Sequence, residues 1–228
     1  MAVTETPPET VDAASESAAS PPHAQPTGLA GVLGSGDHKV IGRLYIVASL
    51  VFGALVLGLG EAFAVEGIKP DAYNVFDASN AYQYFTLARL GPIFLLALPL
   101  VIGLALVVVP LQVGARSVAF PRAAAASFWA WLLSSILLVI SYIPGVGGGM
   151  AIDPTTASDP LVGKQMSELT FLALIGVALA MLLAAVCVVT TIVTLRTPGM
   201  HLDQIPLFSW SMLVAGGIWL LTVPVFIG

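Results

Sequence analysis

The run from Leu90 to Leu111 constrains this chain more than any other stretch, because it carries no charge and is apolar throughout. About 20 apolar residues are needed to cross a bilayer as a helix, and this run supplies them. Five runs in the chain are long enough and poor enough in charge to be spans: Val40–Gly60, Ala81–Leu111, Ala124–Ile143, Glu168–Leu195 and Leu207–Ile227. They are unbroken, and they lack the alternation of barrel strands. The sequence therefore predicts an all-α polytopic membrane protein with five transmembrane helices.

The composition agrees with a membrane protein and excludes other classes. Only 9% of the 228 residues are charged and 57% are hydrophobic, whereas a soluble domain is about 25% charged. The net charge of −5 gives no sign of nucleic-acid binding. The single cysteine, Cys187, lies in an apolar run, so no intrachain disulfide can form.

The first part of the chain, residues 1–36, is rich in Pro, Ser, Ala, Thr and Gly and has acidic but no basic residues. Such a segment cannot bury enough apolar surface to offset its chain entropy, so we expect a disordered cytoplasmic tail. It is either a solvated tail or a docking tail for a partner. Residues 37–228 then form the five-helix transmembrane domain.

The loop charges predict the orientation in the membrane. One set of helix ends carries Lys39, Arg43, Arg116, Arg122 and Arg196, while the opposite loops carry only Lys69 and Lys164. The first set should be cytoplasmic, which places the N-terminus inside and the C-terminus outside. The expected outer loops collect Glu61, Glu66, Asp71, Asp77, Asp153 and Asp159. These loops either attract a basic extracytoplasmic electron carrier or are ordinary solvated loops.

The inventory of metal-binding side chains argues against a haem held by this chain alone. Its three histidines are His23, His38 and His201, and none lies inside a predicted span. Met181, Met212 and Cys187 do lie in spans, but such residues fill gaps in apolar helices more often than they bind metal. Polar side chains in the third and fourth runs are expected to bond to neighbouring helices or to their own backbone rather than to relay protons: Ser134, Ser135, Ser141, Thr190, Thr191 and Thr194.

Arg89 is the one charge deep within a predicted span, since Arg43 and Glu168 lie near the ends of theirs. At 1.5 Å per residue it lies roughly 12 Å below a helix entry at Ala81. An ionisable group at membrane depth is a functional hypothesis that needs a partner. Arg89 either extends to the outer surface, pairs with Glu168 at the outer end of the fourth span, contacts another subunit, or binds an anionic cofactor group.

Several phrases resemble one family in order along the chain: DHKVIGRLY at Asp37–Tyr45, PLQVGARSVAFPR at Pro110–Arg122, SFWAWLL at Ser127–Leu133 and TPGMHLDQIPLFSWSMLV at Thr197–Val214. They are similar to haem-copper oxidase subunit I, the catalytic subunit of cytochrome c oxidase. The match covers about 190 residues, the first five of the family's twelve helices.

The resemblance implies functional positions at which this chain departs from the family. The family's low-spin haem ligand is a histidine eleven residues before the proline of helix two; here that position is Ala88, and Arg89 stands where the family has glycine. The aspartate at the mouth of the proton channel falls at Ser117, and the channel asparagines fall at Ala124 and Ala125. The family's copper ligands and other haem ligands lie on later helices.

We therefore expect a relative without its own haem or copper, acting as an accessory or structural subunit of an aerobic respiratory complex in the plasma membrane. It would contact membrane lipid and other complex subunits, and we expect no catalytic residue in the chain alone. Small residues would let its helices approach closely: Ala123–Ala126, Ala180, Ala184 and Ala185. Two alternatives remain: one part of a split cytochrome c oxidase subunit I, with haem and copper ligands on another chain, or a degenerate product without a role.

Overall fold

The computed structural model describes residues 31, 34–68, 76, 78–143 and 160–227. The chain divides into two units, Met1–Gly34 and Ser35–Gly228, and the description below concerns the second. The predicted disordered tail falls almost entirely outside the described residues and stays a prediction.

The second unit is built from helices, and its described residues contain no strand. The elements are α2 (His38–Ile68), α3 (Ala78–Gly91), the π-helical turn η1 (Pro92–Ala97), α4 (Leu98–Val113), α5 (Pro121–Ser141), α6 (Pro160–Thr194), the short 3₁₀ turn η3 (Leu202–Gln204) and α7 (Leu207–Ile227). Since α3, η1 and α4 form one continuous span, five segments are long and apolar enough to cross a membrane. The predicted all-α fold with five spans is confirmed.

Two helices are longer than predicted, both at the same end of the bundle. The prediction placed Glu61 and Glu66 in an outer loop, but α2 continues through both residues to Ile68. Glutamate is a good helix former, and a helix can continue past the hydrocarbon where its charges meet water. Similarly, α6 begins at Pro160 rather than at Glu168, with proline at the first helical position, where its missing N–H costs nothing.

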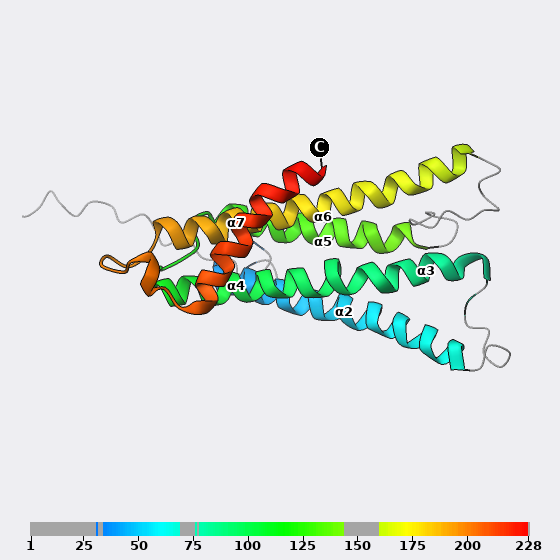
Figure 1. Cartoon of the computed structure of the whole chain (residues 1–228), viewed down its shortest axis with the longest axis horizontal. Coiled ribbons are helices and arrows are strands. Elements are labelled where there is room, and N and C mark those ends of the chain that lie inside the picture. Colours follow the sequence, from blue (N-terminus) through cyan, green and yellow to red (C-terminus); the bar gives the residue numbers. More distant parts are fainter. Residues whose placement is uncertain (1–30, 32–33, 69–75, 77, 144–159, 228) are drawn as a thin grey trace, which may run out of the picture. The chain divides into compact units, whose positions relative to one another are not determined.

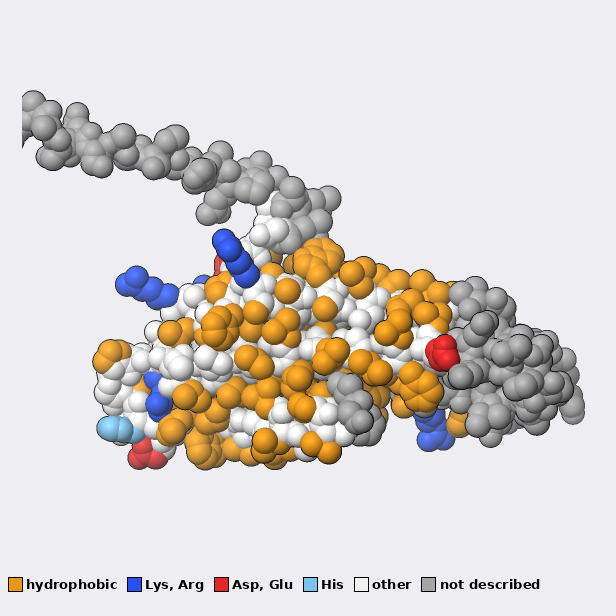
Figure 2. Space-filling model, turned by 90° about the horizontal axis from the view of Figure 1, so that it is seen from above, with side chains coloured by type: hydrophobic (Ala, Val, Ile, Leu, Met, Phe, Trp, Pro, Cys, Tyr) orange, Lys and Arg blue, Asp and Glu red, His pale blue; other side chains and the backbone are white. Residues whose placement is uncertain are grey.

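Some helices pack against the next helix in sequence, and others pack against helices further along the chain. Figure 1 shows α5 lying beside α6 and α2 beside the α3–α4 span, and these two pairs have the most extensive contacts. The last helix, α7, crosses obliquely and contacts both α6 and α4. The face of the molecule seen in Figure 2 is largely hydrophobic along its middle, and most of its Lys and Arg side chains lie toward one end.

The α2–α4 contact depends on two facing glycines. A Cβ placed on Gly42 would lie 2.7 Å from the carbonyl oxygen of Gly103 and would also overlap a methyl group of Val107. A Cβ on Gly103 would lie 2.9 Å from the carbonyl oxygen of Gly42 and 2.8 Å from Cβ of Tyr45. The two backbones can therefore approach this closely only because both residues lack a side chain.

An aromatic cluster fills the space between α2 and α5. The ring of Tyr45 packs edge-on against Phe128, with centroids 5.2 Å apart, and lies 5.4 Å from Trp131. The Tyr45 hydroxyl donates to Ser127 Oγ (2.9 Å), which in turn donates to the Ala124 carbonyl (2.8 Å). All these groups are buried, so the interior at this level consists of packed rings with satisfied polar atoms.

The π-helical turn η1 begins at Pro92 and is followed by Pro99 in the first turn of α4. Neither proline can donate a backbone hydrogen bond. The Leu98 N–H reaches back five residues to the Ile93 carbonyl, which is the bond of a π-helix. The widened turn exposes the Phe94 carbonyl, which accepts a long hydrogen bond (3.4 Å) from Nε1 of Trp131 on α5. The irregular backbone is thus partly satisfied by a neighbouring helix, as lipid surroundings require.

Serine and threonine hydroxyls act mainly within and between helices. Thr191 donates to the Cys187 carbonyl (2.6 Å) and accepts from the Ala119 N–H (2.9 Å), tying the α4–α5 turn to α6. Thr170 donates to Ser141 across α5 and α6 (3.0 Å). These bonds confirm the predicted role for Thr191 and Ser141.

Candidate functional site

Ala88, the position that the resemblance predicts for the family's haem ligand, lies on α3, one turn before η1. Ala88 is half-buried and offers only a methyl group. The preceding residue, Leu87, is buried in the core, and Gly91 packs so closely on Val56 that a Cβ there would lie 2.9 Å from the valine Cβ. This face of α3 is therefore occupied by contacts with α2.

Arg89 points away from this packed face and is exposed. Its guanidinium carbon lies 4.8 Å from the ring centroid of Phe85, one turn earlier on the same helix, which is a cation–π contact. No ion pair joins Arg89 to Glu168, which is also exposed, in the part of the chain that the structure describes. The described contact of the guanidinium is with Phe85, so its role in binding another subunit or an anion stays a proposal.

The three positions that the resemblance predicts for the family's proton channel lie together at the other end of the bundle. Ser117 is half-buried in the turn between α4 and α5, and its hydroxyl donates to the Val118 carbonyl (3.3 Å). Ala124 is fully buried and Ala125 is half-buried in the first turns of α5. These side chains bring no carboxylate or amide to the helix entry. They do not meet Ala88, which lies on α3 in the other half of its span.

The described donor atoms do not fit a haem iron or a copper ion. Among the described residues, imidazoles are present at His38, in the first turn of α2, and at His201, in the turn before α7. Nδ1 of His38 lies 3.4 Å from Asp37 Oδ1, and the thiol of Cys187 lies 3.8 Å from the Phe120 carbonyl. No three His, Cys, Asp or Glu side chains gather within the described residues.

Two hollows that the sequence did not predict open between the helices. The larger, about 340 Å³, is lined by α2, α3 and α5 and includes Tyr84 and Leu87. The smaller, about 110 Å³, lies where α4, α6 and α7 converge and is lined by apolar side chains. Tertiary packing of residues far apart in sequence makes both hollows. Ala185, which lines the second hollow, was predicted only as a small residue that lets helices approach closely.

These observations define a class: a five-span helical membrane bundle with an interior of packed apolar and aromatic side chains, which offers a metal ion no ligand set among its described residues. The family model for cytochrome c and quinol oxidase polypeptide I matches residues 40–228. The chain belongs to this family, as the resemblance indicated.

Individual relatives agree. The chain is 35% identical over 181 residues to a "Heme-copper oxidase subunit I+III" of Aeropyrum pernix, covering 78% of the chain and 22% of that protein. It is 35% identical to "Cytochrome c oxidase subunit 1" of Synechocystis sp., with 83% and 34% covered. It is also 35% identical to "Cytochrome c oxidase subunit 1" of Bacillus subtilis, with 82% and 30% covered. The chain thus spans about a third or less of the length of these curated relatives.

Proposed function

We propose that this protein is an accessory, cofactor-free subunit of an aerobic respiratory complex, built on the first five helices of the oxidase subunit I scaffold. It lies in the plasma membrane with its N-terminus in the cytoplasm and its C-terminus outside. The observation that carries the proposal is the methyl group of Ala88 at the position of the family's haem ligand. Alanine has no lone pair to offer iron, so the chain contributes scaffold rather than a redox centre.

Several buried polar side chains form hydrogen bonds between helices, which supports a structural role. Buried hydroxyls pair within the bundle, as in Tyr45 with Ser127 and Thr170 with Ser141. Near the end of α4, Gln112 Oε1 accepts from Ser209 on α7 (2.6 Å). Because each of these bonds joins two helices, the five spans can pack together without a cofactor between them.

A second candidate function is that the chain is one part of a split cytochrome c oxidase subunit I. The observation in its favour is length: the chain covers 22% to 34% of the relatives cited above. Another polypeptide would then supply the haem and copper ligands for electron transfer to oxygen, and this chain would help to enclose them.

Contacts with other proteins are proposed at two places. Arg89 presents an exposed guanidinium on the apolar surface of α3 and is suited to a carboxylate of a neighbouring subunit. At the end of the bundle assigned to the outside, Glu61 and Glu168 are both exposed. They would draw a basic extracytoplasmic electron carrier, and this attraction would weaken as salt is raised.

The proposed function is tested by purifying the tagged chain from the membranes of its own organism in a mild detergent. We expect it to co-purify with respiratory subunits. A reduced-minus-oxidised spectrum should show no haem once those subunits are removed. If haem stays with the isolated chain, the cofactor-free role is wrong.

Removal of the chain separates the two candidate functions. Loss of the haem spectrum and of oxygen consumption from the partner, with both restored when the chain is returned, would favour the split oxidase. A partner that keeps its haem and loses only assembly yield or stability would favour the accessory role.

A further inference from the structure

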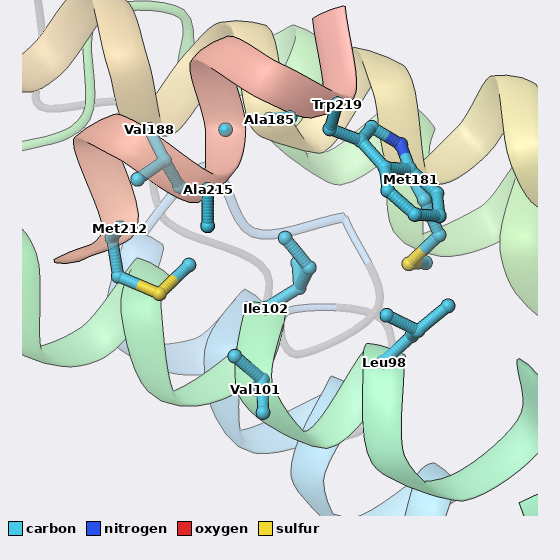
Figure 3. A pocket seen from close by; sticks show the side chains of 10 residues that line it. Leu98, Val101, Ile102, Met181, Ala185, Val188, Met212, Ala215 and Trp219 are labelled. Carbon is cyan, nitrogen blue, oxygen red and sulfur yellow. The ribbon is translucent and has the colours of Figure 1, made fainter. Parts of the chain in front are cut away.

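The larger of the two hollows is the better candidate for a ligand site. The smaller, about 110 Å³, is lined by apolar side chains, with Ile102 of α4 pointing toward Ala215 of α7 (Figure 3). Ligand pockets in proteins measure about 300–1,000 Å³, so the smaller hollow holds no more than a fragment of a ligand. The larger hollow, about 340 Å³, lies within that range.

The larger hollow forms where α2 diverges from α3, toward the end of the bundle at which α3 begins (Figure 1). One face of α2 lines it from Leu55 to Ala62, and α3 contributes Tyr84 and Leu87. The remaining wall comes from the end of α5 and includes Ile143, just beyond the last helical residue. The hollow therefore lies near the ends of three spans, where the hydrocarbon of a bilayer meets the headgroups.

The hollow is open on one side and closed on the other. Leu55 is 49% exposed and Ile143 is 45% exposed, whereas Leu87 and Tyr142 are buried. The opening therefore lies at the α2 and α5 edges, and the closed side faces the interior of the bundle. A group that fills the hollow enters from the lipid leaflet at this end of the bundle.

The volume of the hollow selects a chain rather than a helix. One turn of an α-helix, about 10 Å wide and about 5.4 Å long, fills about 420 Å³, which is more than the whole hollow. An acyl chain is narrower and needs no hydrogen-bond partner. Apolar walls such as Leu55, Leu59 and Leu87 would bury its methylene groups, and each buried methylene stabilises binding by the hydrophobic effect.

Glu66 places a negative charge at the outer mouth of the hollow. It follows Ala62 by four residues, so it lies on the same face of α2, about 6 Å further along the axis. Side chains of a helix lean toward its N-terminus, so the Glu66 carboxylate leans back toward Ala62 and the hollow. Glu66 is half-buried, whereas Glu61, on another face of α2, is exposed. Among the described residues, no ion pair or hydrogen bond joins Glu66 to a partner.

An apolar hollow with a carboxylate at its mouth recognises an amphiphile with a cationic head. A primary ammonium is the best match, because its N–H groups donate charge-assisted hydrogen bonds to a carboxylate. The headgroup of phosphatidylethanolamine carries such an ammonium, whereas that of phosphatidylglycerol carries no cation. Tyr84 lines the hollow near this level, as tyrosines do where hydrocarbon meets headgroups.

We propose that this hollow binds one phosphatidylethanolamine molecule from the leaflet at this end of the bundle. One acyl chain lies in the hollow between α2, α3 and α5, and the ammonium of the headgroup pairs with Glu66. The inference goes beyond the proposed function and does not depend on it, so the failure of either leaves the other standing.

The test titrates the purified full chain, in a mild detergent, with phosphatidylethanolamine or phosphatidylglycerol of identical acyl chains. Bound lipid is counted by native mass spectrometry. We expect one phosphatidylethanolamine per chain, bound about tenfold or more tightly than phosphatidylglycerol, since only the first lipid can pair with the carboxylate. Equal affinity for the two lipids would overturn the inference.

Two charge variants separate the mouth of the hollow from the general charge of this end of the bundle. Glu66→Gln keeps the shape of the side chain and should reduce the preference for phosphatidylethanolamine about tenfold. Glu61→Gln removes the same charge from an exposed position on another face of α2 and should leave the preference within about twofold. An equal loss in both variants would assign the preference to overall charge and contradict the site.

Two leucine variants test the place of the acyl chain. A Cβ meets nothing within 4 Å at Gly58 or at Gly60, so both variants can fold, which circular dichroism checks. Gly58 lines the hollow, and Gly58→Leu should weaken the binding of both lipids about tenfold by filling it. Gly60→Leu adds the same bulk to another face of α2 and should leave binding unchanged. Equal binding by the two variants would place the lipid elsewhere and overturn the inference.

Discussion

The crossing of α2 and α4 gives the sharpest stability prediction. In Gly42→Ala the new methyl group would lie 2.7 Å from the Gly103 carbonyl oxygen and overlap a methyl of Val107. The valine can change its rotamer, but a backbone oxygen in a helix cannot move alone. The two helices must therefore separate, which loosens the contact of Tyr45 with the aromatic cluster behind it.

The size of the effect follows from two opposing contributions. Replacing glycine with alanine inside a helix stabilises it by about 1 kcal/mol. Overpacking a close contact costs about 1–3 kcal/mol. Gly58→Ala, on the same helix, carries only the first contribution, because its Cβ meets nothing within 4 Å. We expect Gly42→Ala to be about 1–3 kcal/mol less stable than Gly58→Ala.

The assay is reversible unfolding in mixed detergent micelles, titrated with a denaturing detergent and followed by circular dichroism. The double variant Gly42→Ala/Gly103→Ala should cost less than the sum of the two single variants by about 0.5 kcal/mol or more, because the first methyl already separates the helices. If Gly42→Ala is as stable as Gly58→Ala, the close approach of the two backbones is not what holds this crossing.

Three further predictions use the same unfolding assay or the purification described above. Tyr45→Phe should cost about 0.5–1.5 kcal/mol, and Ser127→Ala should cost more, because it leaves a buried tyrosine hydroxyl without its acceptor; the opposite order would contradict this bond. Gly114→Ala should cost more than Gly199→Ala: both residues have positive φ (73° and 94°), but only the first Cβ would overlap a threonine hydroxyl. Equal costs would show that backbone strain alone matters. Arg89→Leu should leave the unfolding free energy within about 1 kcal/mol, since the guanidinium is exposed, and should lower partner retention while Arg89→Lys keeps part of it; unchanged retention in both would remove Arg89 from the interface.

The spans could be predicted because lipid imposes one requirement on every residue of a crossing segment. An uncharged run such as Leu90–Leu111 has only one stable form there, so length and composition were enough. The ends of α2 and α6 were harder. Glu61 and Glu66 look like loop residues to a hydropathy count, yet a helix can continue beyond the hydrocarbon with its charges in water.

Some features of the candidate site could be predicted from the sequence, and others depend on the tertiary structure. That Ala88 carries no imidazole needs only the sequence, and its place at the family's haem-ligand position stays a prediction from the resemblance. The smaller hollow, between α4, α6 and α7, depends on residues such as Leu98, Met181 and Trp219, which are more than 30 positions apart in sequence. No local pattern encodes the depth of that hollow, because it arises from the angle at which α7 crosses its neighbours.

The wide turn at Pro92–Ala97 decides which side of the bundle the residues before and after it face. A π-helical turn holds about one residue more than an α-helical turn, so it offsets α3 by roughly 100° relative to α4. Deleting one residue within the turn would restore a regular helix without shortening the span by more than about 1.5 Å. The same deletion would rotate Arg89 away from its present direction. A side chain on α3 and one on α4 therefore face the same side of the bundle at spacings one residue longer than in a regular helix.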